Sequence, residues 1–211
     1  MPVERSPEPP RSEALNQQGE AEIPRRAVAL GLPLLPFLAA RPFQAVAPPA
    51  APQTAKKAFS ATAILFRHAE KSAEGDPKDP PLSEAGRTRA EGIAHLLSRS
   101  RATHLFASEF KRTQETLAPL AEATKLSVVV VPGGKTAELA LKLLALPAGS
   151  VAVVAGHSNT IPALATLLGG TILGTEATAQ GPMLPDSEYG RIFVLTPGIE
   201  EGRCSVLELS T

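Results

Sequence analysis

Cysteine and aromatic residues are scarce in this sequence. The 211 residues include one cysteine, one tyrosine and no tryptophan, and aromatic residues make up 4% of the chain. A single cysteine, Cys204, excludes a disulfide within the chain and any zinc site built on cysteines. So few aromatic rings also argue against stacking platforms for nucleic-acid bases or sugars. Cys204 lies in the apolar segment CSVLEL, and we expect it to be a buried strand residue.

The chain has no excess of charge of either sign. Its 21 basic and 21 acidic residues give a formal net charge of +0, and no basic stripe stands out, so we expect no nucleic-acid partner. The length and the 43% of hydrophobic residues fit one domain with a substantial core. The four histidines do not show the spacing of a metal-binding motif, so we predict neither a metal ion nor a cofactor.

The first 57 residues differ in composition from the rest. Residues 1–57 are rich in Pro, Ala, Glu and Arg and show no strand or helix periodicity, which predicts a disordered extension. Within it, two arginines precede an apolar run at 27–40, which is shorter than the roughly 20 residues that a bilayer-spanning helix needs. With an A-V-A tripeptide at 45–47, the segment 25–47 resembles a signal peptide. It predicts export to the periplasm or the cell exterior, without a stable membrane span. The alternative is an unprocessed extension on a cytoplasmic protein, where it could dock a partner.

From residue 58 onward, apolar runs of strand length alternate with segments of helical periodicity. The predicted strands are 62–66, 104–108, 127–131, 150–156, 191–196 and 204–209, and the predicted helices are 82–100, 109–124, 136–146 and 159–170. This alternation predicts an α/β domain over 58–211. Its architecture should be a three-layer α/β/α sandwich with a mainly parallel central sheet.

Polar and charged residues follow three of the predicted strands. Arg67 and His68 follow the first, Arg112 comes shortly after the second, and His157 follows the fourth. In open α/β sheets, ligands bind beyond the carboxyl ends of the strands, so we expect these four side chains to meet there. Guanidinium groups match the oxygens of phosphate, and a neutral imidazole can attack phosphorus to give a covalent intermediate.

These residues lie in motifs that resemble those of the histidine phosphatase superfamily, also called the phosphoglycerate-mutase-like family. RHAE is similar to the family's R-H-G, SEFKRTQET to S-x-x-x-R-T-x-x-T, GHS to the second-histidine motif, and LSEAGRTRA to the entry of its first helix. The resemblance covers about residues 60–211 and points to the small, single-domain phosphatases. It implies a phosphoglycerate-mutase-like fold, with His68 as phosphate acceptor and with Arg67, Arg112 and His157 holding the phosphoryl group.

One departure from the family pattern is Ala69, which stands where glycine is usual; we expect the turn to tolerate it. The family also takes its proton donor from varied positions. Glu138, near the N-terminal end of a predicted helix, is close to where the mutase-type members carry theirs, and we predict it to be the acid. Glu70, next to the nucleophile, and Asp79, in the loop GDPKDPP, are the rivals.

The resulting hypothesis is a metal-independent phosphomonoester hydrolase that works through phospho-His68. Its substrate could be a small phosphorylated metabolite or a phosphohistidine on a protein. Two alternatives remain open: a phosphoglycerate-type phosphomutase, and a non-catalytic phosphate-binding module that has lost its acid. The short segment after His68 lacks the extra arginines with which a mutase would grip a second acidic group, and this favours the phosphatase.

Overall fold

The computed structural model describes residues 59–198 and 202–211. The predictions made for residues 1–57, including the segment 25–47, therefore lie outside the described residues. Within the described ranges, no helix combines the length and the apolar character that a membrane crossing requires.

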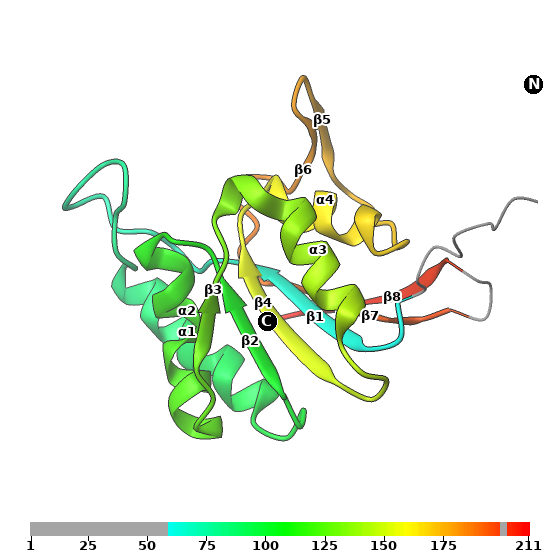
Figure 1. The fold of residues 1–211 in the computed structure, drawn as a ribbon. Coiled ribbons are helices and arrows are strands. Elements are labelled where there is room, and N and C mark those ends of the chain that lie inside the picture. The colour runs from blue at the N-terminus through cyan, green and yellow to red at the C-terminus, as the bar shows by residue number, and fades with distance from the viewer. Residues whose placement is uncertain (1–58, 199–201) are drawn as a thin grey trace, which may run out of the picture. The chain divides into compact units, whose positions relative to one another are not determined.

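Eight strands and four α-helices make up the described part of the chain, with one short 3-10 turn (Figure 1). The strands are β1 (Thr62–Arg67), β2 (His104–Ala107), β3 (Val128–Val130), β4 (Val151–Gly156), β5 (Glu176–Thr178), β6 (Gly181–Met183), β7 (Arg191–Pro197) and β8 (Cys204–Ser210). The helices are α1 (Glu84–Leu97), α2 (Lys111–Thr124), α3 (Thr136–Ala145) and α4 (Thr160–Leu167), and the 3-10 turn Gly133–Lys135 leads into α3.

Six of the strands form one sheet in the order β3-β2-β4-β1-β7-β8. β3, β2, β4 and β1 run parallel to their neighbours, whereas β7 pairs with β1, and β8 with β7, in the antiparallel sense. The prediction of a mainly parallel central sheet is confirmed. Because β7 runs opposite to β1, the N-terminal end of β7 lies at the same edge of the sheet as the C-terminal ends of the parallel strands.

The two faces of the sheet pack against different helices. Ile64 and Phe66 of β1 belong to a core cluster that includes residues of α1 and α2, whereas Ala63 and Leu65 belong to a second cluster with α3 and α4. Successive side chains of a strand point to opposite faces of a sheet, so α1 and α2 cover one face and α3 and α4 cover the other. The predicted three-layer α/β/α architecture is confirmed (Figure 1).

The segment 170–190 holds the main feature that the sequence did not indicate. β5 and β6 form a separate two-stranded antiparallel sheet, which projects as a hairpin from the α4 side of the domain in Figure 1. Each strand has three residues, and those of β5 are all exposed. An exposed strand has no buried face, so it lacks the alternation of apolar and polar residues by which strands are predicted.

Helix α1 begins in close contact with the chain that follows β1. Ser83 is the N-cap and accepts a hydrogen bond from the backbone N–H of Gly86. Both the backbone N–H and the hydroxyl of Ser83 donate to the carbonyl oxygen of Glu70, at 2.9 and 3.3 Å. Gly86 lies so close to this strand end that a Cβ built on it would be 2.2 Å from the same carbonyl oxygen. A glycine is therefore required where the helix meets the RHAE segment.

Gly86→Ala should accordingly destabilise the protein by about 2–3 kcal/mol, because overpacking against backbone forces a shift of the helix or of the strand end. The matched control is Gly92→Ala on the same helix, where no heavy atom other than those of the chain neighbours and the nearby helix backbone lies within 4 Å of the added Cβ. That change should stabilise by up to about 1 kcal/mol, the difference in helix propensity between alanine and glycine. Urea unfolding of both variants measures the contrast, and equal stabilities would disprove the close-contact explanation.

Candidate active site

The C-terminal ends of β1 and β4 place two histidines side by side. Arg67, the last residue of β1, pairs with Gly156, the last residue of β4, and the backbone N–H of His68 donates to the carbonyl of Gly156 at 2.9 Å. The rings of His68 and His157 are 5.4 Å apart between centroids, in an edge-to-face arrangement. The register of two parallel strands thus brings together residues that are far apart in the sequence.

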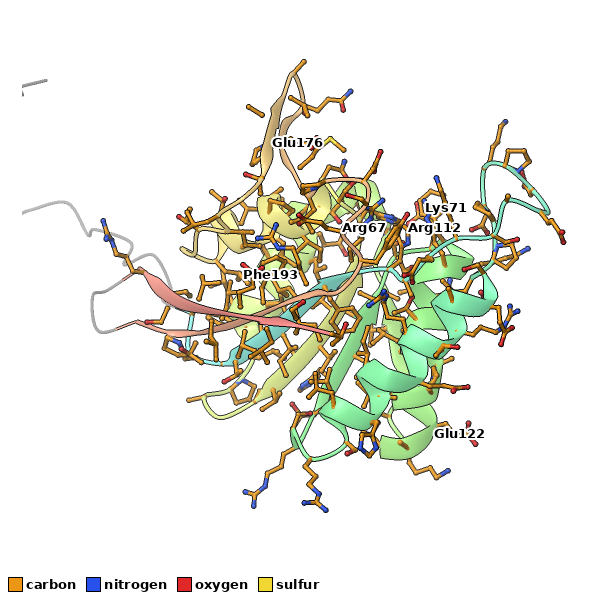
Figure 2. The ribbon with its side chains drawn as sticks, turned by 180° about the vertical axis from the view of Figure 1, so that it is seen from behind. Arg67, Lys71, Arg112, Glu122, Glu176 and Phe193 are labelled. Atoms are coloured by element: carbon orange, nitrogen blue, oxygen red, sulfur yellow. The ribbon has the colours of Figure 1, made fainter. Side chains whose placement is uncertain are left out.

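A cavity of about 530 Å³ opens over this edge of the sheet and is lined by Arg67, His68, Arg112 and His157. Figure 2 shows Arg67 and Arg112 beside one another at this edge. The structure therefore brings together the four residues predicted to bind and accept a phosphoryl group. A larger hollow of about 840 Å³ lies between α1 and α2, but its lining includes no histidine, so the chemistry points to the smaller cavity.

The protonation of His68 follows from its surroundings. Its Nδ1 lies 2.8 Å from the carbonyl oxygen of Ala69, and a carbonyl can only accept, so Nδ1 carries the proton and Nε2 has the free lone pair. Burial, together with the nearby charges of His157, Arg67 and Arg112, lowers the pKa of His68 to about 3. The ring is therefore neutral at pH 7, as a nucleophile must be.

Ala69 fits the turn after His68 without strain. In the described residues, the non-glycine positions with positive φ are Arg101 and Lys125, so Ala69 keeps an ordinary backbone conformation. Its side chain is fully buried beside Leu82, and its N–H donates to the Thr116 hydroxyl at 3.0 Å. This agrees with the expectation that the turn tolerates alanine.

Ser108 fixes the orientation of His157. The hydroxyl of Thr113 lies 2.8 Å from the carbonyl of Phe110, to which it can donate. The hydroxyl of Ser108 is hydrogen-bonded to the hydroxyl of Thr113 at 2.8 Å and to Nε2 of His157 at 2.9 Å. Burial and the charge of Arg112 lower the pKa of His157 to about 4. The imidazole is thus neutral at pH 7 and ready to gain positive character when an anion enters.

Arg67 is held in place by the segment that precedes β7. Its Nη1 donates to the carbonyls of Pro185 and Asp186 at 3.0 and 3.1 Å, and its Nη2 donates to Oδ1 of Asp186 at 3.1 Å and to the hydroxyl of Tyr189 at 3.5 Å. The Tyr189 ring lies against the guanidinium, 4.3 Å from Cζ to the centroid. Nε of Arg67 is buried and has no hydrogen-bond partner in the described part of the chain. Tyr189 and Asp186 were not identified from the sequence.

Arg112 reaches the cavity from the first turn of α2. Its guanidinium lies over the Phe110 ring at 4.3 Å and 3.9 Å from Oδ1 of Asp79. The same oxygen of Asp79 accepts the backbone N–H of Lys111 at 2.8 Å, which caps the start of α2. Asp79, a rival for the acid in the sequence analysis, is thus engaged by the helix and by Arg112, and it is not among the residues that line the cavity.

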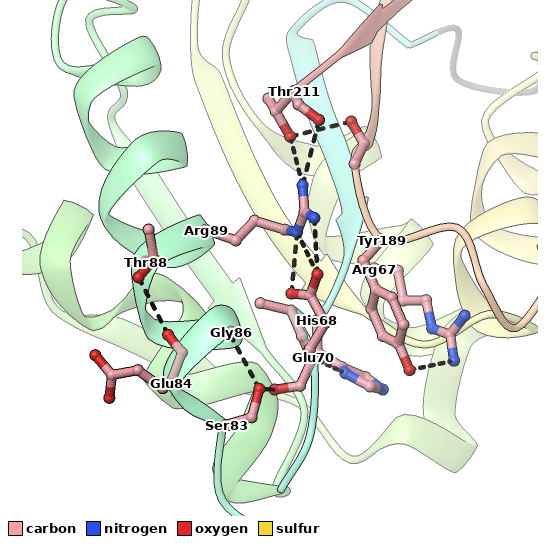
Figure 3. Close-up of polar contacts among 12 residues, drawn as sticks. Arg67, His68, Glu70, Ser83, Glu84, Gly86, Thr88, Arg89, Tyr189 and Thr211 are labelled. Carbon is pink, nitrogen blue, oxygen red and sulfur yellow. Dashed lines mark hydrogen bonds and ion pairs between the residues drawn. The ribbon is translucent and has the colours of Figure 1, made fainter.

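Glu70, the other rival, is held by Arg89 (Figure 3). Nε and Nη2 of Arg89 donate to its carboxylate at 2.7–3.0 Å, and Nη1 donates to Thr211. Hydrogen bonds from Arg89 lower the pKa of Glu70, and this favours the ionised carboxylate over an acid. The arrangement fastens the residues after His68 to α1.

The structure does not bring Glu138 to the cavity. Its carboxylate forms ion pairs on the surface with Lys135 at 3.4 Å and Lys142 at 3.6 Å, and Glu138 is absent from the cavity lining. Its predicted role as the acid stays a prediction for measurements of activity. The carboxylates that do line the cavity belong to Glu109 and Asp186. Glu109 could have been noticed from the sequence, since it lies inside the S-x-x-x-R motif.

Two histidines and two arginines line the cavity. Within residues 59–198 and 202–211, no group of three or more His, Cys, Asp or Glu side chains is arranged to hold a metal ion. What the cavity offers is a neutral imidazole with a free lone pair, two guanidinium groups and a second imidazole. Such a set matches a phosphoryl group, whose oxygens take charge-assisted hydrogen bonds while its phosphorus is attacked.

Comparisons with known proteins point the same way. Residues 63–139 match the model of the histidine phosphatase superfamily (branch 1). A curated relative, the fructose-2,6-bisphosphatase TIGAR of Xenopus tropicalis, is 38% identical over 58 residues, which are 28% of this chain and only 21% of that protein.

Solved structures share the fold at low sequence identity. The protein histidine phosphatase SixA in complex with tungstate is similar with a TM-score of 0.55 and 21% identity, over 71% of this chain and 96% of that one. A mycobacterial glucosyl-3-phosphoglycerate phosphatase is similar with a TM-score of 0.51 and 17% identity, over 71% of this chain and 97% of that one. These likenesses concern the arrangement of the helices and strands.

Proposed function

We propose that the folded domain of this chain, whose residues 63–139 match the model of the histidine phosphatase superfamily, is a member of that superfamily. We propose further that it hydrolyses phosphomonoesters through a covalent phosphohistidine on His68, without a metal ion. One observation carries this proposal. His68 is a buried imidazole that donates through Nδ1 to the carbonyl of Ala69, so its Nε2 lone pair is available. It lies in a cavity that also contains Arg67, Arg112 and His157.

In the first step, Nε2 of His68 attacks phosphorus as the bond from phosphorus to the leaving oxygen breaks. The electron pair of that bond goes to the leaving oxygen, which takes a proton from an acid of the enzyme. Arg67 and Arg112 hold the phosphoryl oxygens, and their charges stabilise the transition state. As the ring of His68 becomes positive, its Nδ1–H bond to the carbonyl of Ala69 strengthens and stabilises the phosphoenzyme.

In the second step, a water molecule attacks the phosphorus of phospho-His68. Its proton passes to the conjugate base of the same acid, the bond between phosphorus and nitrogen breaks, and the electron pair returns to Nε2 of His68. Inorganic phosphate leaves, and the enzyme regains its starting protonation. Two easier steps thus replace one difficult displacement.

The rest of the cavity lining bears on the class of substrate. Besides the phosphoryl-binding residues, the cavity is lined by Lys71, Phe110, Asn159 and Met183, which offer polar and apolar contacts of modest extent. A small phosphorylated metabolite and a phosphohistidine side chain of a protein both fit this description. The named relatives include phosphatases for a sugar bisphosphate, a phosphoglycerate derivative and a protein phosphohistidine, and a substrate panel should contain all three classes.

Hydrolysis of p-nitrophenyl phosphate tests the proposed function. The purified protein should release nitrophenol with a turnover of at least about 1 s⁻¹ at the low end of ordinary enzymes. EDTA should leave this rate unchanged, because histidine and arginine provide both the nucleophile and the charge. Loss of most of the rate in EDTA, restored by a divalent metal, would contradict the metal-independent mechanism.

A further inference from the structure

The proposed mechanism requires a proton donor for the leaving oxygen. We propose that this donor is Glu109, which follows Ser108 and lies two residues before the start of α2; the assignment rests on the proposed function. Two carboxylates line the cavity, those of Glu109 and Asp186, and they differ in how their charge is compensated. Oδ1 of Asp186 forms an ion pair with Arg67 at 3.1 Å, so Asp186 is committed to the group that holds the phosphoryl oxygens.

Glu109 is positioned by the loop after β3. Its Oε2 accepts the backbone N–H of Gly133 at 2.7 Å, which fixes the carboxylate against that loop. A Cβ added to Gly133 would lie 3.5 Å from Nε2 of His157 and 3.7 Å from Oε2 of Glu109, so this carboxylate lies near the His157 ring. That ring is in turn 5.4 Å from the ring of His68 between centroids. Glu109 therefore lines the same cavity as His68 and His157, the cavity in which a phosphoryl group and its leaving oxygen would bind.

The second carboxylate oxygen of Glu109, Oε1, has no hydrogen-bond partner in the described part of the chain. Only Oε2 forms a hydrogen bond in the described part of the chain, and no lysine or arginine there lies within 4.0 Å of the carboxylate. Oε1 can thus carry a proton into the cavity. Glycine at 133 and 134 leaves the opposing loop without side chains, which allows a leaving group to approach.

The other acidic residues considered for this role are occupied elsewhere. Glu70 is bound by Arg89, Asp79 caps α2 beside Arg112, and Glu138 pairs with Lys135 and Lys142. None of the three lines the cavity. In the first step Glu109 gives its proton to the leaving oxygen as the bond to phosphorus breaks, and in the second step it takes a proton from the attacking water.

The test compares leaving groups in wild type and Glu109→Gln. The glutamine amide oxygen can still accept the Gly133 N–H, so the loop keeps its contact, but the side chain no longer supplies an acidic proton. Turnover of an alkyl phosphate such as glycerol phosphate should fall by about 100-fold or more, the usual contribution of a general acid. Turnover of p-nitrophenyl phosphate should fall by less than about threefold, because nitrophenolate leaves without a proton. Over a series of aryl phosphates, the rate of the variant should depend more steeply on the pKa of the leaving group.

Two further variants make the result specific. Glu122→Gln, on the exposed surface of α2 and far from Arg112 in Figure 2, should leave both rates unchanged. Glu138→Gln tests the rival predicted from the sequence. A selective loss with alkyl phosphates in Glu138→Gln rather than in Glu109→Gln would overturn the assignment, as would an equal effect of Glu109→Gln on every substrate. If wild type hydrolysed no phosphomonoester, the proposed function and this assignment would fall together.

Discussion

His68→Asn is expected to lose at least about 10⁴-fold of the turnover of p-nitrophenyl phosphate. His68 is the proposed nucleophile, and removal of a nucleophile from a covalent mechanism commonly has an effect of this size or larger. Asparagine is chosen because its side-chain amide can still donate to the carbonyl of Ala69, as Nδ1 of His68 does at 2.8 Å. The turn at the end of β1 should therefore keep its shape, and the loss can be attributed to chemistry.

Trapping of the intermediate gives an independent measurement. Wild type mixed with a ³²P-labelled substrate and quenched in alkali should carry label that is lost in acid, the stability expected of a phosphoramidate, whereas His68→Asn should carry none. His95→Asn, on the exposed surface of α1, is the matched control and should behave as wild type. Turnover within about tenfold of wild type in His68→Asn would exclude phospho-His68 as the intermediate.

Arg112→Ala is expected to reduce kcat/KM by about 10²–10³-fold, the usual consequence of losing one preorganised donor to a developing charge. Arg112 lines the cavity, and its guanidinium contacts the Phe110 ring and Asp79, so it is held in place before the substrate arrives. Arg112→Lys keeps the charge but loses the planar fork that binds two oxygens. It should recover only part of the rate.

The affinity for inorganic phosphate separates binding from folding in these variants. Inhibition by phosphate should weaken in Arg112→Ala and in Arg112→Lys, while their thermal unfolding stays close to that of wild type. Arg99→Ala, at an exposed position at the end of the α1 region, should change neither quantity. Undiminished inhibition by phosphate in Arg112→Ala would show that this arginine does not bind the phosphoryl group.

The placement of Glu138 shows where sequence reasoning reached its limit. Glu138 was predicted from its distance along the chain after Arg112 and from its place near a helix start. In the fold, its nearest charged partners are Lys135 and Lys142, within one turn on the same helical segment. The side chain therefore stays at the surface. A separation in sequence places a residue on an element but does not decide which way its side chain points.

The residues that bind Arg67 could not be predicted from the sequence either. Asp186 and Tyr189 lie about 120 positions further along the chain, in a segment without periodicity or motif. They reach Arg67 because β7 pairs with β1 in the antiparallel sense, which returns the start of β7 to the edge where β1 ends. The sequence indicated that 191–196 is a strand but not its direction, because the same apolar alternation serves either direction.

The sequence by itself determined the alternation of strands and helices, the two-sided core, and the four residues Arg67, His68, Arg112 and His157. These features depend on local periodicity and on short motifs at strand ends, both of which can be read within a few residues. The tertiary structure alone decided which carboxylates line the cavity, how Ser108 orients His157 and how Arg67 is held. Those contacts join segments that are distant in the chain, and their formation depends on strand order, strand direction and packing, which no single segment encodes.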